Sequence, residues 1–233
     1  MKLSMQQVNY LEQLTVQYAT QEDHDGDCEG GVEGEFNVIQ GGNGDEILEG
    51  GAGRDEIFGG NGQDVLQGGA GFDHLNGENG DDVLYGGKGK DNIEGGNGDD
   101  LLIGGCGPDT LIGDHGNDVL DGGNSPDVLT GGHGNDIFVL RLPGGGMEGG
   151  GMGGGGGMGG GGHSETECDV ITDFQIGVDL IALGNQFSYG NLSFAGEYIS
   201  VINSSDGSSQ SRVLVKLSGI DTQTLKSENF FTL

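Results

Sequence analysis

Gly59-Gly60-Asn61-Gly62-Gln63-Asp64-Val65-Leu66-Gln67 is one copy of a nine-residue unit that repeats eleven times, without a gap, from residue 41 to residue 139. When the unit is numbered 1 to 9, position 1 is Gly in all eleven copies and position 4 is Gly in ten. Position 6 is Asp in ten copies, and position 8 is always apolar. A strict short period of this kind predicts a stacked array whose units do not fold alone.

Each position of the unit has a simple structural interpretation. Gly at positions 1, 2 and 4 suits a tight turn with positive φ, where a side chain would clash. Positions 7 to 9 are rich in Val, Ile and Leu, which favour a short strand. Side chains alternate along a strand, so positions 6 and 8 point to the same face. If position 8 faces the core, the carboxylate at position 6 is directed inward, and a buried carboxylate needs a counter-charge.

The counter-charge has to come from outside the array. Residues 41–139 contain only three basic side chains, Arg54, Lys88 and Lys90, against 20 acidic ones. Carboxylates together with free carbonyl groups of the turns form an all-oxygen ligand set, which suits a hard and flexible cation such as Ca²⁺ rather than zinc. The apolar positions are also too few to stabilise an array of this length alone, so we expect folding to be coupled to metal binding.

Two kinds of candidate metal ligand follow from these positions. The acidic candidates at position 6 are Glu46, Asp55, Asp64, Asp73, Asp82, Asp91, Asp100, Asp109, Asp118, Asp127 and Asp136. The candidate main-chain carbonyl ligands in the turns are those of Gly60, Gly62, Gly69, Gly71, Gly87, Gly89, Gly96 and Gly98. Four departures from the unit are expected to weaken individual sites: Glu46, Glu78, Asp114 and the Ser125-Pro126 pair.

This unit, G-G-x-G-x-D-x-U-x, resembles the hemolysin-type (RTX) calcium-binding repeat. The resemblance implies that two consecutive repeats make one turn of a right-handed parallel β-roll, with calcium ions held between turns. The Asp of one repeat would then share an ion with the Asp two repeats on, as Asp64 with Asp82, or Asp73 with Asp91. Eleven repeats allow nine such pairs (11 minus 2), so roughly eight or nine ions are implied.

The composition excludes several other classes of protein. The chain has 233 residues, of which 55 are Gly and none is Trp, so a conventional globular core over most of its length is excluded. A net charge of −30 argues against nucleic acid and anionic membranes as partners and favours cations. The sequence has no long apolar segment, no H-E-x-x-H zinc-protease helix and no G-x-S-x-G nucleophile elbow. We therefore expect neither membrane insertion nor an enzyme.

The residues before the array are expected to contribute little to function. Residues 1–31 form a leader that is either a weak amphipathic helix or disordered. Residues 23–34 invite comparison with an EF-hand loop, but Cys28 stands where Gly is needed and Gly34 where Glu is needed, so an acidic linker is favoured. Residues 32–40 look like a decayed repeat that caps the first turn, with Asn37 and Ile39 at positions 6 and 8.

The array, assigned to residues 32–140, is followed by a predicted flexible linker at residues 141–168. Its stretch from Gly144 to Gly162 consists almost only of Gly and Met, which cannot fix a backbone. A copper site is the alternative, with Met147, Met152, Met158, His163 and Cys168 as ligands, but Gly does not pre-organise such a site. The three cysteines form no disulfide framework, and Cys106 is expected to be an exposed turn residue.

Order is expected to resume in residues 169–233, which are predicted to form a small β cap. Residues 169–183 resemble the segment D-x-I-x-D-F-x-x-G-x-D-x-I-x-L that follows hemolysin-type arrays. In that family this segment adds final strands to the roll and closes its end. Two alternatives stay open for Asp173 and Asp179, which are either ligands of a terminal ion or turn and cap residues.

Later parts of the cap carry weaker signals. Strands are predicted at residues 198–202 and 213–217, and a short helix at residues 222–229. Glu228 followed by the apolar residues of Phe230–Leu233 is similar to an uncleaved type I secretion signal, although a terminal strand has the same pattern. No apolar core of a cleavable signal is present near Lys2, which favours export by type I machinery.

These observations predict an all-β protein, a right-handed parallel β-roll (β-solenoid) of nonapeptide repeats with a small C-terminal β cap. The leading functional hypothesis is a secreted, non-enzymatic protein that binds several Ca²⁺ ions and folds when it does so. One alternative is a structural or adhesive module of the cell surface that calcium merely stabilises. The other is the remnant of a larger secreted protease, lipase or toxin.

Overall fold

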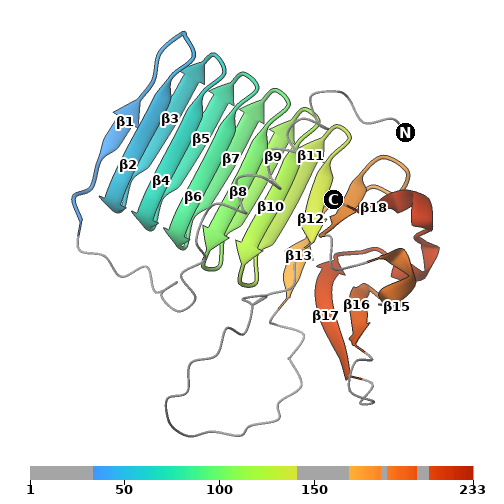
Figure 1. Cartoon of the computed structure of the whole chain (residues 1–233). Coiled ribbons are helices and arrows are strands. Elements are labelled where there is room, and N and C mark those ends of the chain that lie inside the picture. Colours follow the sequence, from blue (N-terminus) through green and yellow to red (C-terminus); the bar gives the residue numbers. More distant parts are fainter. Residues whose placement is uncertain (1–33, 141–167, 185–187, 204–209, 233) are drawn as a thin grey trace, which may run out of the picture.

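The computed structural model describes residues 34–140, 168–184, 188–203 and 210–232. In these residues the strands of successive repeats alternate between two stacked sheets (Figure 1). The predicted all-β class and the parallel β-solenoid are confirmed. The predicted leader at 1–31 lies outside the described residues, as do the EF-hand-like loop except Gly34 and the predicted linker with its alternative copper site except Cys168, which is buried.

The first sheet has the strand order β1-β3-β5-β7-β9-β11-β13-β17-β16-β15, and the second has β18-β14-β12-β10-β8-β6-β4-β2. The strands of the array are β1 (Val38–Gln40), β2 (Ile47–Gly53), β3 (Glu56–Asn61), β4 (Val65–Gly71), β5 (His74–Asn79), β6 (Val83–Gly89), β7 (Asn92–Asn97), β8 (Leu101–Cys106), β9 (Thr110–His115), β10 (Val119–Asn124), β11 (Val128–His133) and β12 (Ile137–Leu140). The C-terminal elements are β13 (Asp169–Ile171), β14 (Leu180–Leu183), η1 (Tyr189–Asn191), β15 (Leu192–Ala195), β16 (Tyr198–Asn203), β17 (Gln210–Leu217), η2 (Thr222–Thr224), η3 (Ser227–Asn229) and β18 (Phe230–Thr232).

One turn of the roll takes two repeats. In the first sheet Ile57 on β3 lies opposite Leu75 on β5, and in the second sheet Leu66 on β4 lies opposite Leu84 on β6, a separation of 18 residues in each case (75 minus 57, and 84 minus 66). Parallel pairing at this register lines up the same repeat position from turn to turn. Each position of the unit therefore becomes a column that runs along the axis of the roll.

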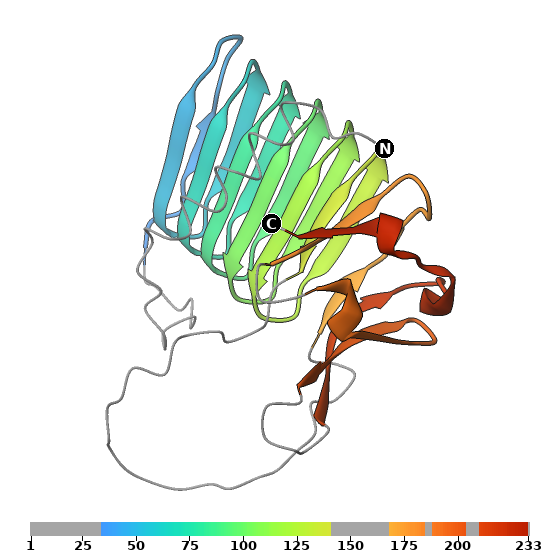
Figure 2. The same ribbon diagram turned by 45° about the vertical axis from the view of Figure 1, so that its right-hand side comes forward.

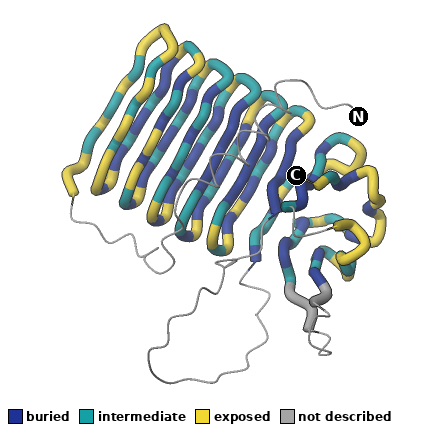
Figure 3. The backbone as a smooth tube through the Cα atoms, in the orientation of Figure 1, coloured by how far each residue is buried: buried dark blue, intermediate teal, exposed yellow. Residues whose placement is uncertain are grey.

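Position 8 fills the interior between the two sheets. Ten of the eleven side chains, from Ile57 to Phe138, have no exposed surface, whereas Leu48 in the first turn is only partly buried. Positions 7 and 9 flank this core on the outside, as Val65 and Gln67 flank Leu66 on β4. Figure 3 shows the alternation of buried and more exposed residues along the strands, and the greater exposure of the first turn.

Stacking of like turns explains the glycines at positions 2 and 4. Gly60 and Gly62 have φ of 108° and 136°, a region that L side chains avoid. A Cβ on either residue would also collide with a carbonyl oxygen of the preceding turn. Glu78 and Asp114 occupy position 2 with φ of 68° and 73°, so these two turns adopt the left-handed conformation without the freedom of Gly.

The C-terminal segment continues the roll before it closes it. β13 pairs in parallel with β11, and β14 pairs in parallel with β12, so each adds a strand to one sheet. β15, β16 and β17 form an antiparallel meander beside β13, and β18 pairs with β14. Figure 2 shows these elements at the end of the stack opposite to the first turn. The strands predicted at 198–202 and 213–217 are thus present, within β16 and β17.

Residues 222–229 do not form the predicted single helix. They form two separate 3-10 turns, η2 and η3, because Leu225 between them has extended backbone angles (φ −71°, ψ 146°). Asp221 caps η2, with its side chain accepting a hydrogen bond from the N–H of Gln223. The chain then enters β18, so the apolar residues near the C-terminus belong to a strand of the second sheet.

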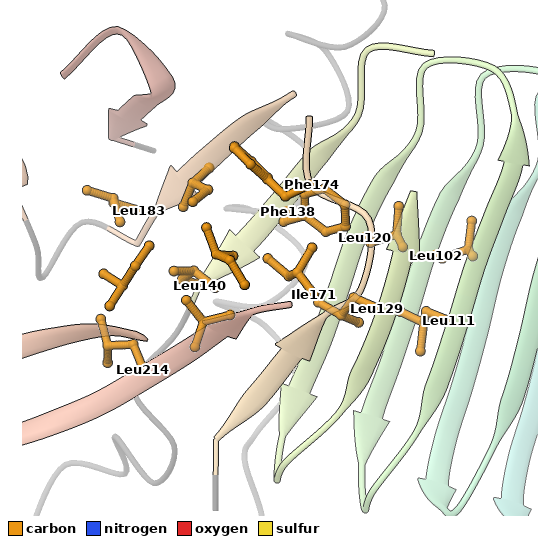
Figure 4. Close-up of a cluster of buried hydrophobic side chains, with 14 of the residues drawn as sticks. Leu102, Leu111, Leu120, Leu129, Phe138, Leu140, Ile171, Phe174, Leu183 and Leu214 are labelled. Carbon is orange, nitrogen blue, oxygen red and sulfur yellow. The ribbon is translucent and has the colours of Figure 1, made fainter. Parts of the chain in front are cut away.

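Apolar side chains join the cap to the array. The rings of Phe138 and Phe174 are 6.1 Å apart between centroids, and Leu140, Ile171 and Leu183 continue the same core beyond the last repeat (Figure 4). The interior of the roll therefore passes into the cap without a polar break.

Two further features of the fold, a second apolar cluster and the state of Cys106, were not predicted. A second apolar cluster forms at positions 7 and 9 of the second sheet and includes Leu101, Val119 and Ile137, which are at most 3% exposed. Cys106 is half-buried and disulfide-bonded rather than an exposed turn residue. Within the residues that the structure describes, no helix has both the length and the apolar character needed to cross a membrane.

Candidate metal centre

Two columns of aspartates run the length of the roll, one along each edge. On one edge the backbone N–H of Asp64 donates to Oδ1 of Asp82 over 2.8 Å, and on the other the N–H of Asp73 donates to Oδ1 of Asp91 over 2.9 Å. Every Asp at position 6 accepts the same bond from the residue two repeats earlier, at 2.8–3.0 Å. The aspartates that the RTX resemblance pairs are therefore direct neighbours in the structure.

The second oxygen of each carboxylate has no hydrogen-bond partner. The ten aspartates at position 6 are at most 3% exposed, and their Oδ2 atoms are buried without a donor. The ten are Asp55, Asp64, Asp73, Asp82, Asp91, Asp100, Asp109, Asp118, Asp127 and Asp136. An unsatisfied buried carboxylate oxygen is strongly unfavourable, and a folded protein ordinarily has few of them. Ten in regular columns mean that the folded array has to protonate these groups or accept cations beside them.

The Oδ2 atoms share their surroundings with main-chain carbonyl groups. A Cβ placed on Gly59, at position 1, would lie 2.7 Å from Oδ2 of Asp64 and 2.7 Å from the carbonyl oxygen of Gly77 in the next turn. The same two kinds of oxygen surround position 1 of every repeat from Gly50 to Gly113. Gly at position 1 thus keeps open a small cradle lined by carboxylate and carbonyl oxygens, which are the ligands that Ca²⁺ prefers.

Burial raises the pKa of the column aspartates from Asp64 to Asp136 in the folded array. It raises the pKa of Asp82 and Asp91 to about 7 and that of Asp100 to about 9. Loss of water is the largest cause, and neighbouring carboxylates of the same column, Asp82 and Asp118 in the case of Asp100, raise the pKa further. The hydrogen bond from the preceding backbone N–H opposes both effects. A folded array without cations would therefore hold protons on many of these groups near neutral pH.

The two columns extend past the array at both ends. Asn37 stands before Asp55, and its backbone N–H and side-chain amide both donate to Oδ1 of Asp55 at 2.9 Å. At the other end the N–H of Asp127 donates to Asp169 at 3.1 Å. Sequence reasoning did not place Asp169 in the column, although the D-x-I pattern at 169–171 was the signal that could have shown it.

Asp173 and Asp179 each accept a hydrogen bond at both carboxylate oxygens. Asp173 accepts from the N–H groups of Gly131 and Gly132 at 3.0 and 2.7 Å. Asp179 continues the second column by accepting from the N–H of Asp136 at 3.2 Å, and its other oxygen accepts from the N–H of Gln175 at 2.7 Å. These contacts fit a turn and cap role, and each oxygen keeps a lone pair that could also ligate a terminal ion.

The glycines whose main-chain carbonyl groups were predicted to be metal ligands occupy positions 2 and 4, four on each edge of the roll. The carbonyl oxygens of Gly69 and Gly71 lie against Gly87 and Gly89 of the next turn. The carbonyl oxygens beside the Oδ2 atoms belong instead to position 1, from Gly68 to Gly131, and sequence reasoning missed them. The invariance of Gly at position 1, where most of the glycines have ordinary φ, was the available signal.

The solvent-facing turn residues at positions 3 and 5 differ between the two edges. We call one edge the Asn-rich edge; it comprises the turns 41–46, 59–64, 77–82, 95–100, 113–118 and 131–136. We call the other the basic edge; it comprises the turns 50–55, 68–73, 86–91, 104–109 and 122–127. Three acids, Asp45, Asp81 and Asp99, stand at these positions on the Asn-rich edge, whereas all three basic residues of the array stand on the basic edge.

The Asn-rich edge also carries a ladder of side-chain hydrogen bonds. The Nδ2 of Asn61 donates to Oδ1 of Asn43 at 2.9 Å, and the ladder continues through Asn79 and Asn97 at 3.3 and 3.0 Å. At position 5, the N–H of Asn117 donates to Oδ1 of Asp99 at 2.8 Å. In the described parts of the chain no group of three or more His, Cys, Asp or Glu side chains is placed to hold one metal ion. An ion in the roll would thus take main-chain carbonyls as ligands as well.

Four overlapping segments of the array match the RTX calcium-binding nonapeptide repeat family, at residues 40–75, 58–93, 94–125 and 112–140. Residues 40–140 are therefore an RTX-type β-roll. The match covers both aspartate columns and all the position-1 cradles of the array. The calcium-binding character of the RTX repeats agrees with the carbonyl oxygens that accompany eight of the ten orphaned Oδ2 atoms.

Solved structures similar to this RTX β-roll include the extracellular lipase LipA from Serratia marcescens, with 14% identity and a TM-score of 0.33, over 85% of this chain and 40% of the lipase. They also include the AlgE6R2 subunit of the Azotobacter vinelandii mannuronan C5-epimerase, with 24% identity and a TM-score of 0.36, over 60% of this chain and 91% of that subunit. The chain thus spans less than half the length of the lipase. No curated protein matches the sequence.

Proposed function

We propose that this RTX β-roll binds several calcium ions between its turns and folds when it binds them. The observation that carries the proposal is the pair of columns of buried Oδ2 atoms that have no hydrogen-bond donor. Without a cation, the fold has to bury these oxygens unsatisfied or protonate the carboxyl groups. A divalent cation between turns removes both penalties, so its binding free energy becomes folding free energy.

The proposed ligands are oxygens of successive turns on the same edge. Asp64 with Asp82, and Asp73 with Asp91, would each share an ion, and the same holds along both columns, with Glu46 taking the place of Asp in the first repeat. Main-chain carbonyls of the turn glycines would complete each site, from positions 2 and 4 as predicted and from position 1 as the cradles indicate. Nine pairs (11 minus 2) set the expected number of ions at roughly eight or nine.

The donor set favours calcium over other common cations. Calcium accepts six to eight oxygen ligands at flexible geometry, whereas magnesium demands a near-octahedral shell and retains several waters. Zinc prefers thiolate and imidazole ligands, and neither type lines the cradles. The ion supplies positive charge between the columns, and the chain's own oxygens orient and enclose it.

Calcium-coupled folding would suit a secreted, non-enzymatic protein. A chain with a net charge of −30 repels itself, so at the low calcium concentration of a cytosol the array would stay unfolded and ready for export, as through type I machinery. Outside the cell, open turn sites with an affinity of about 10⁻⁴–10⁻³ M would fill and the roll would form.

The test is a calcium titration of the whole chain followed by far-UV circular dichroism, with magnesium as the control. We expect a cooperative gain of β structure at about millimolar calcium and no gain with magnesium. Calorimetry on the same protein should show several Ca²⁺ bound per chain, and failure to bind them would refute the proposal. A chain that is already folded in chelator would instead support the structural or adhesive module that calcium only stabilises.

A further inference from the structure

The basic edge carries a pocket that borders its aspartate column. It has a volume of about 400 Å³ and lies at the turns that enter β3, β5 and β7. One wall consists of Arg54, Phe72 and Lys90, the other wall consists of His74, Asn92 and Thr110, and Asp73 and Asp91 of the aspartate column complete the lining.

The two walls are columns of the repeat. Arg54, Phe72 and Lys90 stand at position 5 of alternate repeats, whereas His74 and Asn92 stand at position 7, on the same outward side of the strand. Neighbouring strands of a sheet are about 4.8 Å apart, so successive members of each column repeat at that spacing along the roll. Arg54 and Lys90, two turns apart, are therefore separated by roughly 10 Å along the axis, with Phe72 between them.

The cations of this wall have no carboxylate partner. Arg54 and Lys90 are exposed, and none of the ion pairs among the described residues includes them, although the chain has 38 acidic residues against 8 basic ones. In so acidic a protein, a scattered cation would be expected to find an acidic neighbour. Two unpaired cations two turns apart indicate instead a surface that attracts an anionic ligand.

Between the two cations lies an exposed aromatic ring. Phe72 is 55% exposed, although it sits in a turn whose counterpart positions accept Arg, Lys and Pro. The opposite wall is polar and held in place: Glu94 accepts from Nδ2 of Asn92 at 3.2 Å, and its carboxylate lies 3.7 Å from Nε2 of His74. An apolar ring facing fixed polar groups, with charges at either end, is the usual layout of a binding site for a polar organic ligand.

We propose that this pocket binds a linear acidic polysaccharide that runs along the axis of the roll. A pyranose ring would pack its C–H face on Phe72, and acid groups of the flanking sugars would pair with Arg54 and Lys90. The turn spacing is close to the length of one sugar unit, so one sugar can face each turn. Hydroxyl groups would meet the polar wall of His74 and Asn92.

A polysaccharide fits this site better than a nucleic acid. Nucleic acids carry dense charge and bind mainly through many phosphate contacts, each of which needs a cation. The pocket offers two cations within a chain of net charge −30, which would repel a dense polyanion more strongly than a polymer with about one charge per sugar.

The test is calorimetric titration of the calcium-loaded full chain with short oligosaccharides of equal length. The probes are an oligogalacturonate (carboxylated), a sulfated glucan oligomer and a neutral malto-oligosaccharide, with a single-stranded oligonucleotide as the fourth arm. Free calcium is held constant, and each sugar is also titrated into buffer alone because uronates themselves bind calcium. Saturable binding of one or both acidic sugars, and not of the neutral one, is expected; the better of the two acidic probes identifies the acid group.

Variants assign the binding to the pocket. Arg54→Glu and Lys90→Glu should each weaken binding by about tenfold or more, as should Phe72→Ala. Lys88→Glu is the matched control, because Lys88 is exposed on the same edge but does not line the pocket, and it should change affinity less than about threefold. Circular dichroism at saturating calcium confirms that each variant is folded. Equal weakening by Lys88→Glu and Lys90→Glu, tighter binding of the oligonucleotide, or no saturable sugar binding would overturn the proposal.

Discussion

The two edges of the roll share one inner structure and differ in what they present to solvent. Both carry an aspartate column in which each Oδ1 holds the backbone of the preceding turn and each Oδ2 is orphaned. On the outside, the Asn-rich edge presents acids and a ladder of amides, whereas the basic edge presents Arg54, Lys88 and Lys90. A strict repeat thus fixes positions 1, 2, 4, 6 and 8 and leaves positions 3, 5, 7 and 9 free to differ.

The comparison distinguishes the positions of the repeat that determine the fold from the positions that give each edge its own surface. The fixed positions either face the interior or lie where a Cβ would strike the next turn, so the packing of turns dictates them. The free positions of the turns, 3 and 5, lie outside this core, where a substitution changes charge without changing the stack, whereas positions 7 and 9 of the second sheet include a buried apolar cluster. We therefore expect changes at fixed positions to act alike on both edges and changes at free positions to act differently on the two.

The largest expected effect is that of pH on the stability of the metal-free fold, because pH acts on the aspartate columns of both edges together. Burial raises the pKa of Asp100 on the Asn-rich edge, and of Asp127 on the basic edge, to about 9, from an ordinary value of 3.8. Because the folded carboxyl groups bind protons more tightly than the unfolded ones, the metal-free fold gains stability as pH falls from about 9 toward 4.

In chelator, the chain should therefore be unfolded near pH 8 and should gain β structure by circular dichroism at about pH 5. The lower limit avoids the isoelectric point, which is near 4.1 for this sequence, and sedimentation velocity should confirm that the protein remains monomeric. A chelated chain whose far-UV spectrum does not change between these two pH values would contradict the assigned burial of the columns.

Single replacements in the columns should have the next largest effect, and an equal one on both edges. Asp82→Ala and Asp91→Ala each remove an Oδ1 that holds a buried backbone N–H and an Oδ2 that faces a cradle. Loss of the hydrogen bond alone costs about 1–3 kcal/mol, and loss of calcium ligands adds to it. We expect both variants to bind fewer Ca²⁺ ions by calorimetry and to need more calcium to fold.

The matched control is Asp81→Ala, because Asp81 is next to Asp82 in the sequence but occupies position 5, which points outward. It should leave the number of bound ions unchanged. If Asp82→Ala reduced that number while Asp91→Ala did not, only the Asn-rich edge would hold calcium, and the equivalence of the two columns would be lost.

Much of this arrangement could be predicted from the sequence because residues at the same position of every repeat lie in the same environment. A residue type that recurs at every ninth position, such as the apolar residues at position 8, indicates by its period alone that these side chains share one environment. The position of Asp64 beside Asp82 followed from the same period once two repeats were taken as one turn. The decayed repeat at residues 32–40 was also recognisable, because Asn37 and Ile39 stand at positions 6 and 8 of the unit.

What could not be predicted depends on contacts that leave no mark in the pattern of side chains. The carbonyl groups at position 1, such as that of Gly77, approach an aspartate of a different turn, and no side-chain pattern records that approach. Asp169 follows a long interruption of the repeat, so its place in a column is set by the pairing of β13 with β11. The wall of Arg54, Phe72 and Lys90 has no common residue type and becomes visible only when the turns are stacked.

A smaller effect is expected from charges at the free positions, and it should have opposite sign on the two edges. Asp81→Asn removes a negative charge near the calcium sites of the Asn-rich edge and should weaken calcium binding there. Lys90→Gln removes a positive charge near the sites of the basic edge and should strengthen binding. Because Lys90 is exposed, Asp81 is only half-buried and salt screens both charges, each shift in the calcium midpoint should be about two- to threefold.

The measurement is the midpoint of calcium-induced folding, taken at low and at high ionic strength. Both shifts should shrink as salt is added, because screening lowers the interaction of exposed charges. Glu49→Gln, on an outward face away from the turns, is the control and should move the midpoint least. Shifts of the same sign for Asp81→Asn and Lys90→Gln would mean that net charge of the whole chain, rather than the edge, governs affinity.

The smallest expected effect concerns the amide ladder of the Asn-rich edge. Asn79→Ala removes two exposed hydrogen bonds, to Asn61 at 3.3 Å and from Asn97 at 3.0 Å, and should lower the free energy of unfolding by about 0.5–1 kcal/mol at saturating calcium. The backbone of position 3 accepts Ala without strain, as Ala70 shows on the basic edge, so the loss reports the ladder itself. Lys88→Ala, at position 3 of that edge, should leave the urea midpoint almost unchanged. If Lys88→Ala lowered the free energy of unfolding as much as Asn79→Ala does, the stabilisation would come from the turn backbone, which is common to both edges, and not from the ladder.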